Sequence, residues 1–171
     1  MNIVLFGFKG CGKSYFGQKL ALALERPFID TDLLIVERWN KGGGKEKTPS
    51  EIYRKIGERA FRDLETKTIA SLNESSDSII AVGGGAVINP ENVMMLRKNG
   101  RMIFLDTSLA TVLSRNIDTA LGPLEKLYAE RYPIYHSIVA DKVNIDALTE
   151  NEVLRSLIVL AQQRTPTYGI K

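Results

Sequence analysis

The stretch with the clearest chemical signature lies near the amino end, at Gly7–Ser14, and reads GFKGCGKS. Two glycines five positions apart, followed by Lys and Ser, fit the P-loop pattern. Glycines let such a loop point successive backbone N–H groups at one anion, and the first turn of a following helix adds further donors. The pattern predicts that Lys13 reaches the β- and γ-phosphates of a nucleotide and that the Ser14 hydroxyl takes a position on Mg²⁺.

The residues on either side supply the context that a P-loop needs. The apolar run at 3–6 predicts a short buried strand. Phe16, Leu20 and Leu24 recur at the spacing of one helix face, which predicts a helix to about residue 25. A glycine-rich turn that binds nothing would explain the glycines alone, but the order of strand, glycine loop and helix favours phosphate binding.

Two acidic residues follow the next predicted strand, at 27–30. Asp30 and Asp32 come at its carboxyl end, where ligands bind in an open α/β sheet. The alternation of side chains along a strand would point both carboxylates the same way. A plain helix N-cap is the alternative interpretation, because Asp is favoured at that position.

Three glycines, Gly83–Gly85, follow a predicted buried strand at 78–82. Glycines at the end of a strand let a ligand or another backbone come very close. Close packing alone is the alternative, but these glycines fall at the same sheet edge as the P-loop, which favours contact with a ligand. Upstream, Arg62 and Glu65 share one face of a helix predicted over 58–72, and a weak surface ion pair is the commoner arrangement for such residues.

Helix starts and breaks organise much of the remaining sequence. Capping-box patterns predict two helix starts, at 48–51 and 149–152, and Gly57 is expected to break the first of these helices. The glycine-rich segment 41–47 is predicted to be a flexible surface loop, since no strand precedes it. Pro133 is expected to kink or restart a helix that begins near residue 124.

Strands and helices alternate through the whole chain, with further strands predicted at 102–105 and 142–146. This alternation predicts the α/β class, with a mostly parallel sheet covered on both faces. No repeat or linker divides the chain, so a single domain over 1–171 is expected. Residues 116–123 have turn-like composition and lie where a mobile lid would sit, and residues 165–171 are expected to form a loose tail.

The 171 residues carry a net charge of +3, and the pI is near 9.0. The basic residues are scattered and no nucleic-acid motif stands out, so cations gathered around anionic small molecules explain the charge better. No apolar run approaches the ~20 residues of a membrane span. Cys11 is the only cysteine, which excludes an internal disulfide, and no leader pattern is seen, so a cytoplasmic protein is expected. His136, the only histidine, is expected to be structural.

Taken together, five motifs resemble those of the shikimate kinase family, small P-loop kinases of aromatic amino-acid biosynthesis. They are the P-loop, the Asp30–Asp32 segment, Phe61-Arg62 with Glu65, the glycine triplet, and Arg131–Tyr135, which reads RYPIY. The resemblance spans nearly the full length. It implies a three-layer α/β/α fold with a five-stranded parallel sheet in the order 2-3-1-4-5, substrate-binding helices at about 33–72 and a lid at about 116–126.

The resemblance also implies the chemistry and the residues that carry it. The γ-phosphoryl group of ATP would pass to the 3-hydroxyl of shikimate with the help of Mg²⁺, and Lys13 and Asp32 would be catalytic. Asp32 would orient or deprotonate the attacking hydroxyl, and Asp30 would hold waters of the metal. ATP would be held by Gly10, Cys11, Gly12, Lys13, Ser14, Tyr15 and Arg115. Shikimate would be bound by Asp32, Arg62, Gly83, Gly84, Gly85 and Arg131, with Glu65 anchoring Arg62.

Two departures from the family pattern stand out. The family's lid has an Arg-Pro-Leu-Leu segment whose arginine contacts ATP phosphates, whereas the nearest match here is Gly122-Pro123-Leu124, without an arginine. Either a nearby cation takes over, with Lys126 the first choice, or turnover is weak. The loop at 40–47 is a few residues longer than usual and borders the substrate region.

Three alternatives remain open from the sequence. The first is a related small-molecule kinase that acts on gluconate or a nucleotide. The second is an ATP-binding regulatory module with weakened catalysis, and the third is a basic nucleic-acid binder. Arg62 and Arg131 argue for an acidic substrate, which favours the shikimate kinase hypothesis. Under that hypothesis a monomer is expected, with no nucleic-acid or membrane partner.

Overall fold

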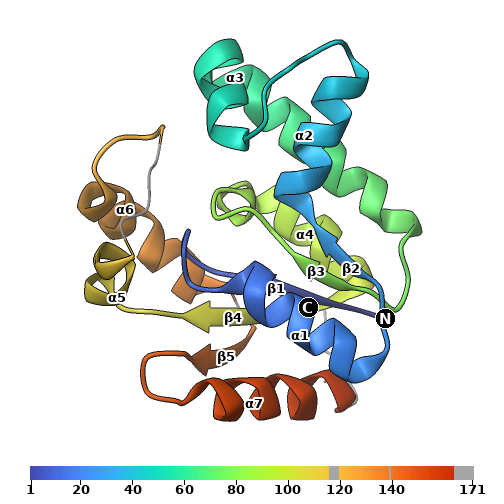
Figure 1. The fold of residues 1–171 in the computed structure, drawn as a ribbon, viewed down its shortest axis with the longest axis vertical. Helices are drawn as coiled ribbons and strands as arrows, with labels where there is room; N and C mark the ends of the chain where they lie inside the picture. The colour runs from blue at the N-terminus through green and yellow to red at the C-terminus, as the bar shows by residue number, and fades with distance from the viewer. Residues whose placement is uncertain (116–119, 139, 164–171) are drawn as a thin grey trace.

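The computed structural model describes residues 1–115, 120–138 and 140–163. The described residues form a five-stranded parallel sheet in the order β2-β3-β1-β4-β5, which confirms the predicted topology (Figure 1). The strands are β1 (Asn2–Phe6), β2 (Phe28–Asp30), β3 (Ile79–Ala81), β4 (Gly100–Asp106) and β5 (Asp141–Asn144).

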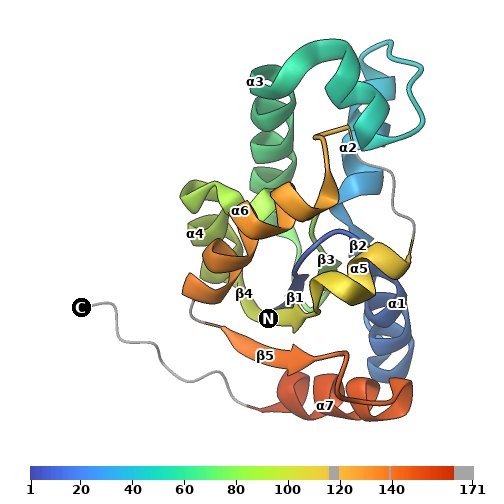
Figure 2. The ribbon, with the colours of Figure 1, turned by 90° about the vertical axis from the view of Figure 1, so that its left-hand side faces the viewer.

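Helices cover the sheet and extend beyond one of its ends. They are α1 (Lys13–Leu24), α2 (Thr31–Lys41), α3 (Pro49–Ala70), α4 (Pro90–Asn99), α5 (Leu109–Ser114), α6 (Leu124–Ser137) and α7 (Glu150–Gln162), with short 3₁₀ turns at Ser71–Glu74 and Ala86–Ile88. Figures 1 and 2 show α2 and α3 side by side beyond the end of β2, where they form a lobe above the sheet. This lobe has its own small apolar core, built around Ile35, Ile52 and Phe61.

Burial on both faces explains why the strands read as continuous apolar runs. In β1, Ile3 and Leu5 pack into a core shared with α1 and α7. The alternate residues Val4 and Phe6 face a second core that is shared with α3, α4 and α6. A parallel sheet covered by helices on both faces is the arrangement that such strands require. The three-layer prediction is therefore confirmed.

Most predicted helix signals act as expected. Both capping boxes are present, at Thr48 with Glu51 and at Thr149 with Glu152. Gly57 interrupts α3 with φ 79° and ψ 170°, a conformation outside the helical region. Pro133 lies inside α6, which continues through it to Ser137, so of the two expected outcomes it does not restart the helix. The backbone N–H that Pro133 lacks and the crowding by its ring do not end this helix.

The glycine-rich loop at 41–47, expected to be flexible, is anchored by Glu46. The Glu46 carboxylate accepts hydrogen bonds from Lys55 Nζ and Trp39 Nε1, both at 2.5 Å, and from the Lys45 backbone N at 3.0 Å. These hydrogen bonds, that from Lys55 first, lower the pKa of Glu46 to about 2. The loop lies at the surface as predicted, but it is tied to both helices of the lobe.

None of the helices in the described part combines the length and the apolar composition that crossing a bilayer requires. The predicted tail at 165–171 and the first part of the predicted lid, at 116–119, lie outside the described residues. His136 lies on α6, where its ring contacts Tyr132 and Phe104 and its Nε2 is 3.6 Å from Asp106 Oδ1. These contacts agree with the structural role expected for this histidine.

Candidate active site

The P-loop joins β1 to α1, and glycine conformation shapes it. Gly12, the residue before α1, has φ 95°, in the left-handed region where a side chain is strained. Lys13 is buried, and its Nζ donates to the carbonyl oxygens of Gly7 at 3.1 Å and Phe8 at 2.9 Å. The predicted order of strand, loop and helix is confirmed, and Lys13 stabilises the loop through the carbonyl groups of its first residues.

A cavity of about 240 Å³ opens beside this loop, and we call it the P-loop cavity. Its lining includes six residues expected to hold the nucleotide or its metal: Gly10, Gly12, Lys13, Ser14, Tyr15 and Asp30. The Ser14 hydroxyl donates to Asp30 Oδ2 at 2.5 Å, so a hydroxyl and a carboxylate oxygen meet at the start of α1. Magnesium takes oxygen ligands of this kind together with waters and phosphates, so this pair suits the ion.

Two other expected nucleotide residues lie differently. Arg115, at the end of α5, donates to the Gly10 carbonyl oxygen, which brings its guanidinium to the P-loop. The Cys11 side chain is fully buried in the core shared with α1 and α7, and it does not line the cavity. Any contact between Cys11 and a nucleotide has to come from its backbone.

The two acidic residues of the 30–32 segment have different backbone positions. Asp30 ends β2 and caps α2, with its Oδ1 accepting from the Asp32 backbone N at 2.9 Å. Asp32 belongs to the first turn of α2, so the expectation that strand alternation aligns the two side chains is wrong. The reason is that the helix begins at Thr31. Both carboxylates nevertheless line the P-loop cavity.

Asp32 lies in an unusual electrostatic environment. Burial raises the pKa of its carboxyl group, and the nearby charge of Asp30 raises it further. The charges of Lys13 and Lys9 act in the opposite direction. A carboxyl group with a raised pKa is a better proton acceptor than an ordinary surface aspartate, which suits a general base.

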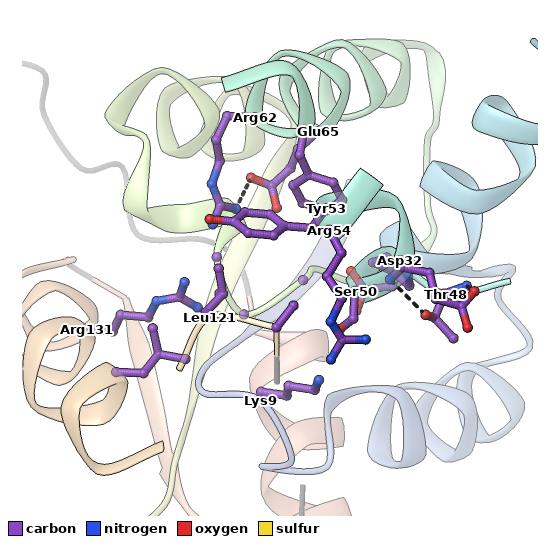
Figure 3. Close-up of a pocket in the computed structure, with 18 residues that line it drawn as sticks. Lys9, Asp32, Thr48, Ser50, Tyr53, Arg54, Arg62, Glu65, Leu121 and Arg131 are labelled. Atoms are coloured by element: carbon purple, nitrogen blue, oxygen red, sulfur yellow. Dashed lines mark hydrogen bonds and ion pairs between the residues drawn. The ribbon is translucent and has the colours of Figure 1, made fainter. Parts of the chain in front are cut away.

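A second cavity, of about 420 Å³, lies between the sheet edge, the α2–α3 lobe and α6 (Figure 3). We call it the arginine cavity, because Arg62 from α3 and Arg131 from α6 both line it. Asp32 and the glycine triplet line it as well. Every residue expected to bind shikimate therefore reaches this one cavity.

The ion pair of Arg62 and Glu65 is part of this cavity and not a surface pair. Arg62 Nη1 lies 2.9 Å from Glu65 Oε2, and the Glu65 side chain is only 4% exposed. Burial raises the pKa of Glu65, while the Arg62 charge opposes that rise. The alternative of a weakly interacting surface pair is wrong, because the pair points inward from α3. Glu65 thus positions the guanidinium of Arg62.

The glycine triplet packs closely against three different neighbours. A Cβ on Gly83 would lie 2.6 Å from Asp32 Oδ1, and one on Gly85 would lie 2.4 Å from Arg62 Nη1. A Cβ on Gly84 would lie 3.1 Å from the backbone N of Lys9 in the P-loop. The two interpretations of the triplet, close packing and contact with a ligand, are therefore compatible. The same three glycines pack against Asp32, Lys9 and Arg62, and they also line the arginine cavity.

Hydrogen bonds hold the triplet from both sides. Tyr135, buried on α6 one turn after Arg131, donates its hydroxyl to the Gly84 carbonyl oxygen at 2.5 Å. The buried Thr31 hydroxyl accepts from the Gly83 backbone N at 2.9 Å. Neither role was foreseen from the sequence, although Tyr135 belongs to a recognised motif. A tyrosine at helical spacing from Arg131 was the available signal.

Other lining residues were also missed. Tyr53 and Arg54 reach the cavity from the first part of α3, and Lys9 reaches it from the P-loop. On the lid side, Ala120 and Leu121 line the cavity, whereas the segment 122–124, which had seemed the nearest match to the family's lid motif, does not. The sequence did offer one signal for Lys9, namely a cationic side chain inside the P-loop.

The fold and the two adjoining cavities define a class of protein, the P-loop kinases that phosphorylate a small acidic molecule. A comparison with protein families agrees, because the model described as shikimate kinase matches residues 9–162. The chain belongs to the shikimate kinase family.

Known relatives cover almost the whole chain. The shikimate kinase of Sulfurihydrogenibium sp. is 36% identical over 171 residues, which cover 95% of this chain and 99% of the relative. Among solved structures, the shikimate kinase of Aquifex aeolicus is 30% identical with a TM-score of 0.74, covering 94% of this chain and 95% of that one. The Acinetobacter baumannii shikimate kinase, solved in complex with shikimate, is 26% identical with a TM-score of 0.76 and covers 94% and 90%.

Proposed function

We propose that this shikimate kinase family member transfers the γ-phosphoryl group of ATP to the 3-hydroxyl of shikimate, with each site residue acting as follows. The observation that carries the proposal is that Asp32 lines both cavities, with the P-loop on one side and Arg62 and Arg131 on the other. A relative of 26% identity was solved with shikimate bound, which supports this acceptor.

On the nucleotide side, P-loop amides hold the phosphates, and Lys13 leaves its carbonyl partners to reach the β- and γ-phosphates. Ser14 and Asp30, whose side chains meet at the start of α1, would hold Mg²⁺, with Asp30 holding waters of the metal. When bound there, Mg²⁺ neutralises charge on the phosphate oxygens. Tyr15 borders the same cavity, and Arg115 lies beside the P-loop near the nucleotide.

On the acceptor side, Arg62 and Arg131 bind the shikimate carboxylate, since guanidinium groups match a carboxylate in geometry and charge. Glu65 keeps Arg62 pointed at it. The glycine triplet lets the ring lie close to the main chain, with Gly84 in contact. Asp32 accepts a hydrogen bond from the attacking hydroxyl and takes its proton as the new P–O bond forms.

A coupled ADP-release assay tests this function. Shikimate, gluconate and a nucleoside monophosphate are compared as acceptors at equal concentration with Mg–ATP. We expect ADP release to be stimulated by shikimate and not by the other two, because only shikimate pairs a carboxylate with ring hydroxyls of the right size. ADP release without stimulation by shikimate would contradict the proposal.

We also propose that one chain is sufficient for activity. Asp32, Arg62 and Arg131, which act on the acceptor in this proposal, all reach one cavity of the chain, so the proposed chemistry needs no residue of a second chain. Light scattering on the active protein is expected to give the mass of a monomer. Activity that rises with protein concentration alongside a dimer mass would contradict this.

A further inference from the structure

The two cavities meet where the P-loop passes the glycine triplet. Among the described residues, three line both cavities, namely Lys9, Asp32 and Gly84. Gly84 has no side chain, so the side chains at the junction are one ammonium and one carboxylate. A phosphoryl group that moves from the P-loop to an acceptor beside Arg62 has to pass this junction.

The main chain of Lys9 is held in place on both sides. The preceding residue, Phe8, is buried, and its ring packs edge-on against Tyr128 with the centroids 5.2 Å apart. The Cβ position of Gly84 lies 3.1 Å from the Lys9 backbone N, so the P-loop and the triplet are in close contact there. Lys9 itself is half-buried, and Figure 3 shows it across the arginine cavity from Arg62. Its ammonium is therefore tethered to a well-held segment at the junction.

Two other lysines are placed differently. Lys13 lines only the P-loop cavity, and its ammonium lies against the carbonyl groups of the loop. Lys126, the cation first considered for the missing lid arginine, is exposed on α6 and lines neither cavity. Of these three lysines, Lys9 is the one that faces both the nucleotide side and the acceptor side.

We propose that Lys9 is a catalytic residue of the transfer, an inference that rests on the proposed function. Its ammonium, which keeps its proton throughout, stabilises charge on the γ-phosphoryl oxygens as they cross the junction. The bond from the γ-phosphorus to the β–γ bridging oxygen breaks, and the bond from the shikimate oxygen forms. ADP leaves with the electron pair of the broken bond, and the hydroxyl proton goes to Asp32. Charge placed in advance at the reacting group lowers the barrier more than it tightens substrate binding.

The test compares Lys9→Met with Lys9→Arg. Methionine keeps an unbranched side chain without the charge, and arginine keeps the charge. Lys98→Met is the matched control, because Lys98 is exposed in the last turn of α4, just before β4 begins, at the opposite edge of the sheet from the P-loop. We expect Lys9→Met to lower kcat by about 100-fold while KM for shikimate and for Mg–ATP changes by less than about fivefold. Lys9→Arg is expected to recover most of kcat, and Lys98→Met to match the wild type.

A binding measurement separates this role from a structural one. Calorimetry is done with Mg–ADP alone and with Mg–ADP, shikimate and aluminium fluoride, which mimics the phosphoryl group in transfer. We expect Lys9→Met to weaken the fluoride complex about as much as it lowers kcat, with binding of Mg–ADP alone unchanged within about twofold. Equal weakening of both would overturn the proposal, as would a Lys9→Met kcat within about twofold of the wild type.

Thermal unfolding shows whether each variant folds, and Lys9→Gln takes the place of the methionine variant if that one does not. Failure of this inference and failure of the proposed function give different results. A wild-type chain that binds Mg–ADP but is not stimulated by shikimate contradicts the function. An active wild type whose kcat survives Lys9→Met contradicts only the role of Lys9.

Discussion

The P-loop cavity and the arginine cavity adjoin but are built in opposite ways. Most of the first is lined by one stretch of chain at 9–15, completed by Asp30 at the end of β2, Asp32 at the start of α2, the end of β3 with the residue after it, and Gly84. The second draws on the P-loop, α2, both parts of α3, the glycine triplet, the lid side and α6. A contiguous loop carries its own conformation, whereas an assembled cavity depends on contacts between distant segments. Damage to packing is therefore expected to reach acceptor binding before it reaches nucleotide binding.

The largest expected effect comes from Asp32, whose carboxylate lines both cavities. Asp32→Asn keeps the shape of the side chain but removes its capacity to take a proton. We expect kcat to fall by about 10² to 10⁴-fold, with Mg–ATP binding retained. Steady-state kinetics and calorimetry measure the two quantities. Turnover equal to that of the wild type would show that Asp32 does not act as the base.

A side chain added to the glycine triplet should disturb the arginine cavity and leave the P-loop cavity unchanged. In Gly85→Ala the new Cβ would lie 2.4 Å from Arg62 Nη1, so the guanidinium must move away from its place beside Glu65. Loss of a charged hydrogen bond to the substrate predicts a rise in KM for shikimate of about 10- to 100-fold, with KM for Mg–ATP unchanged.

The control for this variant is Gly42→Ala at the end of α2. Gly42 has an ordinary φ of −82°, and the nearest atom to its Cβ position is 3.3 Å away. It is expected to behave as the wild type. An equal rise in both KM values for Gly85→Ala would mean that the two cavities are not separable in this way.

A milder change tests the support beneath the triplet. Tyr135→Phe removes the hydroxyl that donates to the Gly84 carbonyl oxygen. We expect the free energy of unfolding to fall by about 1–2 kcal/mol and KM for shikimate to rise by about threefold. Tyr128→Phe is the matched control, since its hydroxyl donates to the Thr107 carbonyl oxygen at 2.7 Å. That variant should lose similar stability in chemical denaturation without the change in KM, and identical kinetics for both variants would contradict a specific role of Tyr135.

The smallest effect concerns the loop that joins the helices of the lobe. Because its folded pKa is lowered to about 2, Glu46 contributes stability fully above its ordinary pKa of 4.5. This contribution is lost as the pH falls from about 4.5 towards 2. Trp39, the only tryptophan and a donor to Glu46, reports the change by fluorescence.

Glu46→Gln is the matched variant for this pH dependence. We expect it to unfold at a lower temperature than the wild type at pH 7, with the difference shrinking between about pH 4.5 and pH 2. A difference that stays constant across this range would mean that the charge of Glu46 does not hold the loop.

The contrast between a contiguous loop and a cavity assembled from distant segments also explains which features could be predicted from the sequence. The P-loop, both capping boxes and the break at Gly57 depend on neighbours a few residues apart, so their patterns are visible in the sequence. The sheet order and the gathering of Arg62 with Arg131 came from the resemblance to a family. The roles of Thr31 and Tyr135 were missed because each acts on the glycine triplet from about fifty residues away. The expectation for Asp32 failed because a strand and a helix meet within one residue there.

The run of three glycines has a consequence for anyone who wishes to redirect this enzyme towards other acids. An added methyl group would displace the side chain of Asp32 at Gly83 or of Arg62 at Gly85, and at Gly84 it would press on the P-loop backbone, so substitutions in this part of the wall also disturb functional groups. Variation is open instead along the rim, at Tyr53, Arg54 and Leu121, which line the arginine cavity from outside the triplet. Libraries confined to those three positions should change acceptor preference without affecting the binding of the nucleotide phosphates by the P-loop.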